Sequence, residues 1–196
     1  MTKRIFLSFL ICLPFWAIAQ DHKATVTSQF LQYYDHIRKK EFEKATDYMN
    51  PAFFSLVPKD QLITAMASVF NTPGLEFETD EATIKEVGPV VKKEKMQYVI
   101  IEYSSVLRMR FSGELAASAS PDAMKANFER QYGKENVSYN DSTGFYSINA
   151  QKKAVANSED GKKWTFVVLE PRQYAMLKTF IPEEFHGFRK NKKGTR

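Results

Sequence analysis

Cysteine is almost absent from this chain of 196 residues, which contains only Cys12. Cys12 lies in a mostly apolar stretch, and Phe, Leu and Ile precede it where a lipid-attachment site needs small residues. An internal disulfide needs two thiols, and a thiolate zinc site needs more than one. The composition therefore excludes internal disulfides and thiolate zinc sites, and the fold must depend on its hydrophobic core.

Histidine is also scarce, and its three copies, His22, His36 and His186, are far apart in the sequence. None falls on an expected strand, so the usual side chains for proton transfer and metal binding do not gather in one place. A glycine-rich phosphate loop, a nucleophile elbow and a zinc-ligand spacing are missing as well. We therefore expect no catalytic histidine, no metal site and no cofactor.

No apolar run reaches the roughly 20 residues that cross a bilayer core as a helix. The longest spans residues 5–18, follows Lys3 and Arg4, and is followed by small residues at Ala17 and Ala19. This is the three-part pattern of a secretory signal peptide, so residues 1–19 are predicted to be removed together with Cys12. The protein is then expected to be exported, periplasmic or extracellular, and soluble. An uncleaved N-terminal membrane anchor is the alternative.

Neither sign of charge is in strong excess. Loss of Lys3 and Arg4 with the signal lowers the formal net charge from +5 to +3. Basic residues are dispersed except in residues 187–196, which we predict to be a flexible basic tail. That tail is interpreted as a solvated chain end, with contact to an anionic surface as the alternative. Nucleic acid is not an expected partner.

Residues 20–186 are predicted to form one domain that begins with helices. Val26, Phe30, Tyr33 and Ile37 form one apolar stripe at helical spacing, and a bend is expected near Lys40. A second helix is expected over residues 58–70, with an inward face made of Leu62, Met66, Val69 and Phe70. A third is expected over residues 121–133, between a Ser120 cap and Gly133, and its buried face is made of Met124, Phe128 and Tyr132. A final helix is expected after Pro171.

Between these helices the apolar pattern changes to a period of two. Strands are expected over residues 81–91, 96–112, 145–150, 154–158 and 163–169. In the long second strand, Tyr103 belongs to an apolar face and Glu102 to a polar face, and a bulge is expected at Ser104–Ser105. The predicted class is α+β: N-terminal helices against a strongly curved antiparallel sheet, with an inserted and a C-terminal helix.

Three segments, "FLQYYDHIRKKEFEKATDYMNPAF", "QYVIIEYSSVLRMRF" and "DGKKWTFVVLEP", together resemble the nuclear transport factor 2-like superfamily, specifically its small exported bacterial members. The resemblance implies a cone, in which the sheet wraps around the first helix and leaves a cavity at its wide end. The helices at residues 121–133 and after Pro171 depart from the simple form of that fold. Enzymes, ligand binders and inert partners share it, so the resemblance does not choose a function.

Six side chains are candidates for a ligand site: Tyr34, Tyr48, Glu102, Tyr103, Arg108 and Trp164. Tyrosines suit an aromatic wall with polar tips, and Glu102 is placed to be held by arginine in a groove. The sequence favours two other interpretations of the same residues, which are core closure by the tyrosines and a charged ladder on the open sheet face.

These candidates predict a non-enzymatic exported module. It is expected to hold a small apolar or amphipathic ligand, or a protein partner, in the cone cavity or on the sheet face. A homodimer through that sheet face is a further candidate assembly. The alternative function is a cofactor-free lyase or isomerase that uses Tyr103, Glu102 or Asp47.

Overall fold

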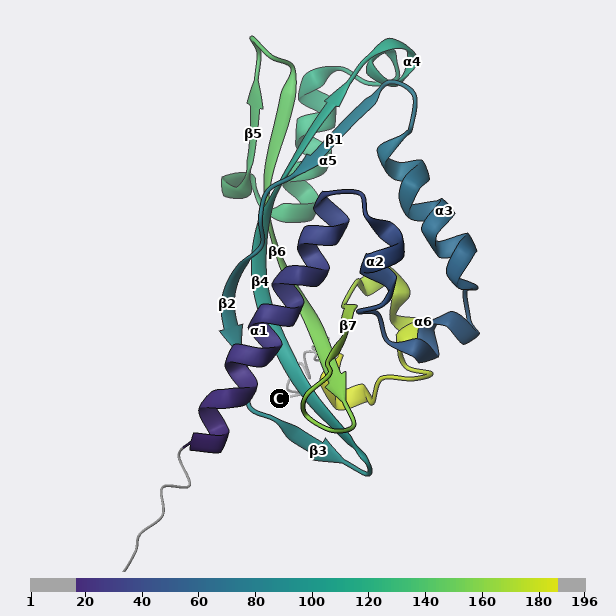
Figure 1. Ribbon diagram of the computed structural model, residues 1–196. Helices are drawn as coiled ribbons and strands as arrows, with labels where there is room; N and C mark the ends of the chain where they lie inside the picture. The colour runs from purple at the N-terminus through teal and green to yellow at the C-terminus, as the bar shows by residue number, and fades with distance from the viewer. Residues whose placement is uncertain (1–16, 187–196) are drawn as a thin grey trace, which may run out of the picture.

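The computed structural model describes residues 17–186, with side chains from His22 onward. The predicted basic tail and most of the predicted signal peptide lie outside the described residues. One antiparallel sheet of seven strands packs against helices, which confirms the predicted α+β class (Figure 1). No helix in this described part of the chain is long and apolar enough to cross a membrane.

The helices are α1 (Ala17–Arg38), α2 (Phe42–Thr46), α3 (Lys59–Phe70), α4 (Gly113–Ala117), α5 (Pro121–Tyr132) and α6 (Tyr174–Leu177). Four 3₁₀ turns accompany them: η1 (Pro51–Ser55), η2 (Lys134–Asn136), η3 (Pro171–Gln173) and η4 (Glu183–Phe185). The strands are β1 (Leu75–Thr79), β2 (Thr83–Val87), β3 (Val91–Lys93), β4 (Met96–Phe111), β5 (Val137–Asn140), β6 (Phe145–Ser158) and β7 (Thr165–Val168).

The N-terminal helices follow the predicted apolar stripe. Val26 and Phe30 are fully buried under α1, which lies across β4 and β6 in Figure 1. The expected bend is present, because α1 ends at Arg38 and Lys40 adopts a positive φ of 60° before α2 begins. Such a left-handed residue stops a helix, since its carbonyl and N–H no longer point along the helix axis.

Strands β4 and β6 are the central pair of the sheet. Their register runs without a shift from Gln97 opposite Ser158 to Arg110 opposite Phe145. Strands β1, β2 and β3 pair with the other edge of β4. The outer edge of β6 is shared by β5, which pairs with residues 145–148, and β7, which pairs with residues 154–157. No described strand pairs with residues 149–152 on that edge, so the sheet has a gap there.

The strands predicted from the sequence differ from those of the structure in several details. The two strands expected over residues 145–158 are one strand, β6. The strand expected over residues 81–91 is divided into β2 and β3. Strands β1 and β5 were not predicted. The bulge expected at Ser104–Ser105 is not there, because β6 pairs with β4 through both serines without a shift; the irregularity lies in β2, between Ile84 and Glu86.

Two hydrophobic clusters occupy opposite faces of the central strands. The first contains Phe30, Val99 and Ile101 and lies between α1 and the sheet. The second contains Tyr98, Val155 and Leu177 and is covered by the segment after β7. Because alternate residues of a strand point to opposite faces, neighbours such as Tyr98 and Val99 belong to different clusters. The predicted C-terminal helix is present only as η3 and the single turn α6, which bury Leu177 completely.

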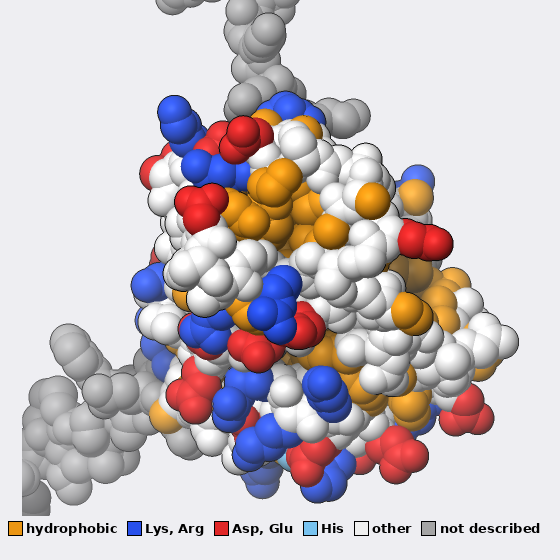
Figure 2. All heavy atoms as spheres, turned by 90° about the horizontal axis from the view of Figure 1, so that it is seen from above, with side chains coloured by type: hydrophobic (Ala, Val, Ile, Leu, Met, Phe, Trp, Pro, Cys, Tyr) orange, Lys and Arg blue, Asp and Glu red, His pale blue; other side chains and the backbone are white. Residues whose placement is uncertain are grey.

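Two helices lie nearer the surface than predicted. Val69 was expected to face inward but is half exposed, and α3 contains no fully buried residue. Helix α5 has its predicted bounds and its Ser120 cap, but Met124, Phe128 and Tyr132 are only half-buried. Seen from above, hydrophobic side chains form a patch in the upper part of the view and further areas toward its lower right, while charged side chains gather mainly on the left and in the lower part (Figure 2).

Candidate functional site

The structure does not bring the six predicted ligand-binding residues together. Glu102 and Tyr103 line one hollow, Tyr48 and Trp164 line a second, Tyr34 lines a third, and Arg108 lines none of these. Only the first hollow combines a predicted aromatic residue with a predicted charged residue. The six residues therefore do not share one hollow, and their role as ligand contacts stays a prediction.

The predicted ion pair between an arginine and the Glu102 carboxylate is not present. The Glu102 carboxylate pairs with Lys153, at 2.5 Å from its Nζ. Arg108 donates instead to Asp80, at 2.6 Å, and lies 3.6 Å from Glu78. These pairs join neighbouring strands on partly exposed sheet positions, where each contributes little to stability. The charged ladder, which the sequence left open as the alternative, describes this face.

Three of the predicted aromatic residues are already hydrogen-bonded within the fold: Tyr34 to the Thr79 hydroxyl at 2.8 Å, Tyr48 to Gln32 at 2.9 Å, and Trp164 to the Gly161 carbonyl at 3.1 Å. Trp164 is only 1% exposed, so it belongs to the core although it contributes to the wall of the second hollow. With their polar atoms satisfied, these side chains serve the closure of the fold.

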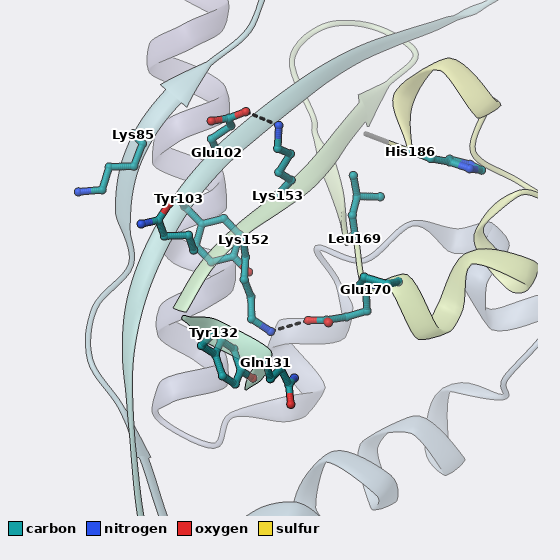
Figure 3. Close-up of a pocket in the computed structure, with 12 residues that line it drawn as sticks. Lys85, Glu102, Tyr103, Gln131, Tyr132, Lys152, Lys153, Leu169, Glu170 and His186 are labelled. Atoms are coloured by element: carbon teal, nitrogen blue, oxygen red, sulfur yellow. Dashed lines mark hydrogen bonds and ion pairs between the residues drawn. The ribbon is translucent and has the colours of Figure 1, made fainter. Parts of the chain in front are cut away.

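The hollow beside Tyr103 lies at the gap in the sheet edge between β5 and β7, and we call it the β6 pocket. It encloses about 380 Å³. Its walls come from β4, from β6, from the end of α5 and from the chain that leaves β7; the central residues are Tyr103, Gln131, Tyr132, Lys152, Leu169 and Glu170. Segments far apart in the sequence thus meet where β6 has no neighbouring strand (Figure 3).

Strand pairing explains why Tyr103 and Lys152 meet in this pocket. They are direct partners of β4 and β6, and directly opposed residues project from the same face of a sheet. Beyond β7 the Leu169 N–H still donates to the Lys153 carbonyl, at 2.9 Å, which brings Glu170 alongside Lys152. The Lys152 ammonium and the Glu170 carboxylate form an ion pair, drawn as a dashed line in Figure 3.

Tyr103 is the most deeply buried of the polar side chains at the centre of the pocket. Only 2% of the residue is exposed, and its ring packs edge-on against Phe30 and Tyr34. Burial raises the pKa of Tyr103 well above its ordinary value, so the hydroxyl is protonated at neutral pH. This hydroxyl has no hydrogen-bond partner among the described residues. Such groups are usually paired in folded proteins, so the pocket holds one unused donor.

The charges around the pocket favour an anion slightly. Lys85, Lys152 and Lys153 line it together with Glu102 and Glu170, which leaves one positive charge in excess. Both carboxylates are ion-paired, with Lys153 and Lys152 respectively. A carboxylate that acts as a general base needs a free lone pair facing the substrate. The lining residues are therefore better equipped to donate hydrogen bonds than to remove protons.

His186 contributes to a further wall of the pocket and is only 1% exposed. Its Nε2 lies 2.7 Å from the Ile181 carbonyl oxygen, and its Nδ1 is buried without a partner. No role was predicted for His186, because its place at the pocket depends on how the chain after β7 packs against the sheet. Lys152 and Glu170 were missed for a similar reason: they become neighbours only through the pairing of β6 with β4 and β7.

The described residues contain no group of three or more His, Cys, Asp or Glu side chains that could hold a metal ion. Comparison of the chain with protein-family models, curated proteins and solved structures gives no match.

Proposed function

We propose that the chain is an exported, non-enzymatic module that binds a small amphipathic molecule in the β6 pocket. The observation that carries this proposal is the Tyr103 hydroxyl, protonated and without a partner on a side chain that is 2% exposed. A neutral hydrogen bond contributes on the order of 0.5–1.5 kcal/mol net. A ligand that accepts a hydrogen bond from this hydroxyl gains free energy of that size.

The remaining walls of the pocket provide apolar surface for the rest of the ligand. Leu169 and Pro171 form one side, and the ring of Tyr132 lies near the end of α5. A volume of about 380 Å³ lies at the low end of the roughly 300–1,000 Å³ of ligand pockets. Aromatic and aliphatic walls with a few polar groups are typical of such pockets, so the ligand is small and amphipathic.

A lyase or isomerase is the alternative function, and the contacts of its three candidate residues speak against it. Glu102 is paired with Lys153. Asp47, which directly follows α2, is paired with Lys59 at the start of α3, at 2.8 Å, and both side chains are exposed. Tyr103 keeps its proton because burial raises its pKa, so it cannot serve as a base near neutral pH. Binding without proton transfer is the function that these contacts support better.

The family and the location belong to the same proposal. Helices packed on one face of an antiparallel sheet are what the nuclear transport factor 2-like resemblance implies, and α1 against β4 and β6 has that arrangement. Helix α5 and the segment after β7 are additions to the simple form, and both contribute walls to the β6 pocket. Export is supported by the signal-like residues 1–19.

A homodimer through the sheet face is a separate proposal for assembly. Arg108 with Asp80 and Arg110 with Glu76 offer ion pairs there rather than apolar area. A contact of this kind weakens as salt screens it. Light scattering that gives only the monomer mass at high micromolar concentration and low salt removes the dimer.

Native mass spectrometry of the protein purified from the producing cells tests the binding function. We expect one recurring added mass on the wild-type protein, reduced or lost in Tyr103→Phe. Tyr146→Phe is the matched control, because that buried tyrosine already donates its hydroxyl to the Pro121 carbonyl, at 3.2 Å and away from the pocket. An added mass that stays unchanged in Tyr103→Phe places the ligand elsewhere and contradicts the proposal.

A further inference from the structure

We infer that the polar end of the ligand is a single carboxylate, bound between the Tyr103 hydroxyl and the Lys152 ammonium. This inference rests on the proposed function and names the chemical class of its ligand. It starts from the hydrogen-bonding capacity that the pocket leaves unused. The donors and the charges of the pocket lead to it separately.

Donors that need an acceptor stand next to each other at the centre of the pocket. The Tyr103 hydroxyl donates to no described residue. A lysine ammonium has three N–H donors, and within residues 22–186 the one partner of Lys152 is Glu170. Because Tyr103 and Lys152 are direct partners on β4 and β6, both project from the same face of the sheet. A carboxylate has two oxygens and can accept from both groups at once.

The charges choose an anion with one negative charge. Three lysines and two glutamates line the pocket as a whole, and one anionic group makes that set neutral; the Glu102–Lys153 pair projects from the opposite face of the sheet to Tyr103 and Lys152. A phosphate monoester carries about two negative charges at neutral pH and would leave an excess of negative charge in a partly enclosed site. A ligand with an ammonium group would be repelled by the positive charge of Lys152 and could not accept the hydrogen bond from Tyr103. Glu170 would be the acceptor left for its N–H groups.

The position of Glu170 leaves room for such a ligand. Its side chain is 37% exposed and that of Lys152 is 25% exposed, so the carboxylate of the pair lies nearer to solvent. Figure 3 shows Glu170 approaching Lys152 from the chain that leaves β7, with the ring of Tyr103 beside the stem of the lysine. A ligand carboxylate can therefore bind Lys152 from the Tyr103 side without removing Glu170, and its apolar part extends toward Tyr132.

Isothermal titration calorimetry on the mature chain, stripped of any copurifying ligand, provides the test. The probes are octanoate, 1-octanol and octylamine, which share one alkyl chain and differ in the head group. We expect octanoate to bind about tenfold or more tightly than octanol, since hydrogen bonds to a charged group are worth more than neutral ones. Octylamine is expected to bind more weakly than either.

Variants assign this preference to the two residues. Lys152→Met is expected to weaken octanoate binding about tenfold or more and to leave octanol binding within about twofold. Tyr103→Phe is expected to weaken octanoate binding and keep the hydrophobic contacts of the ring. Lys59→Met is the control, because it removes one positive charge and one ion pair away from the pocket. Circular dichroism establishes that each variant is folded.

The outcomes separate this inference from the function on which it rests. If octanol binds as tightly as octanoate, and Lys152→Met changes neither, the carboxylate inference fails while ligand binding in the pocket stands. If none of the three probes binds the folded wild-type protein, the carboxylate inference fails and the binding function loses its support. If the preference for octanoate over octanol disappears in Lys152→Met and persists in Lys59→Met, both the carboxylate inference and the binding function are supported.

Discussion

At the scale of single residues, Phe30 is central to the packing of α1 on the sheet. It is fully buried, and its ring contacts the rings of Tyr33, Tyr34, Tyr103 and Phe166. We predict that Phe30→Ala lowers the free energy of unfolding by about 3–5 kcal/mol, because it removes buried area and leaves a cavity. Urea denaturation followed by circular dichroism measures the change.

The neighbouring residue provides the control for that substitution. Leu31 lies on the same helix and is 37% exposed. Leu31→Ala is expected to change the free energy of unfolding by about 0.5 kcal/mol or less. Equal effects of the two substitutions would mean that α1 does not pack on the sheet through Phe30.

Asp160 gives the molecule a predictable response to acid. Its Oδ1 accepts hydrogen bonds from the backbone N–H groups of Lys163 and Lys162, at 3.0 and 2.8 Å, and these lower the pKa of Asp160 in the folded state. A lowered folded-state pKa adds stability above the unfolded pKa, and that stability is lost as the pH falls through the folded pKa. We therefore expect the turn before β7 to weaken below about pH 4.

The test compares urea midpoints at neutral pH and near pH 3 in Asp160→Asn and Glu159→Gln. Both substitutions remove one carboxylate from the same turn, but only Asp160 accepts the two backbone N–H groups. Asp160→Asn is expected to reduce the difference between the two pH values, and Glu159→Gln to leave it near the wild-type size. A full acid-dependent loss in Asp160→Asn would exclude this carboxylate as the cause.

The sequence predicted part of the site, and its limit is visible in individual residues. Tyr103, which lines the β6 pocket, was among the predicted ligand contacts because it is a polar aromatic residue on the apolar face of a long strand. Lys152 and Glu170 could not be chosen, since each looks like an ordinary surface charge in its own segment. They become neighbours of Tyr103 only through strand register, which long-range contacts determine.

At the scale of elements, helix α5 begins at a cap that the sequence predicted. The Ser120 hydroxyl accepts a hydrogen bond from the Ala123 N–H, at 3.2 Å, and Pro121 occupies the first turn. We predict that Ser120→Ala lowers the free energy of unfolding by about 1 kcal/mol, as loss of a cap typically does. Urea denaturation checks this value.

Two further variants make that result specific to the cap. Ser120→Asp keeps an acceptor at the same position and is expected to retain most of the stability. Ser138→Ala removes a hydroxyl from an exposed position of β5 and should be close to neutral. If Ser120→Asp is as unstable as Ser120→Ala, capping is not the reason for the loss.

Helices were predicted better than strands for a physical reason. Helix ends depend on local caps and breakers, such as Ser120 and Pro121 at the start of α5, which are visible in the sequence. Strand β6 instead continues through the polar run Gln151–Lys153, because each of these residues pairs with a residue of β4. The short strands β1 and β5 have the same dependence on a partner, and their isolated sequences carry little signal.

At the scale of the whole molecule, β4 and β6 supply residues to both hydrophobic clusters. Ala154 and Ala156 face the cluster under α1, while Val155 between them faces the cluster under the C-terminal segment. Separation of either cluster from the sheet exposes the same pair of strands. The domain is therefore expected to unfold in one cooperative transition, as small single domains usually do.

Leu177→Ala tests that coupling from the side remote from α1. Leu177 is fully buried in the C-terminal cluster, and its truncation is expected to lower the free energy of unfolding by about 2–5 kcal/mol. Trp164 lies in the other cluster, so its fluorescence reports on the opposite face of the sheet. With cooperative unfolding, the fluorescence and the far-ultraviolet circular dichroism of the mature chain shift to the same lower urea midpoint.

Lys178→Ala, at the exposed neighbouring position, should leave both midpoints unchanged. Early loss of the C-terminal segment with an unaltered Trp164 transition would instead mean that the two faces unfold independently, and that the β6 pocket can lose its Glu170 wall while the α1 face stays folded.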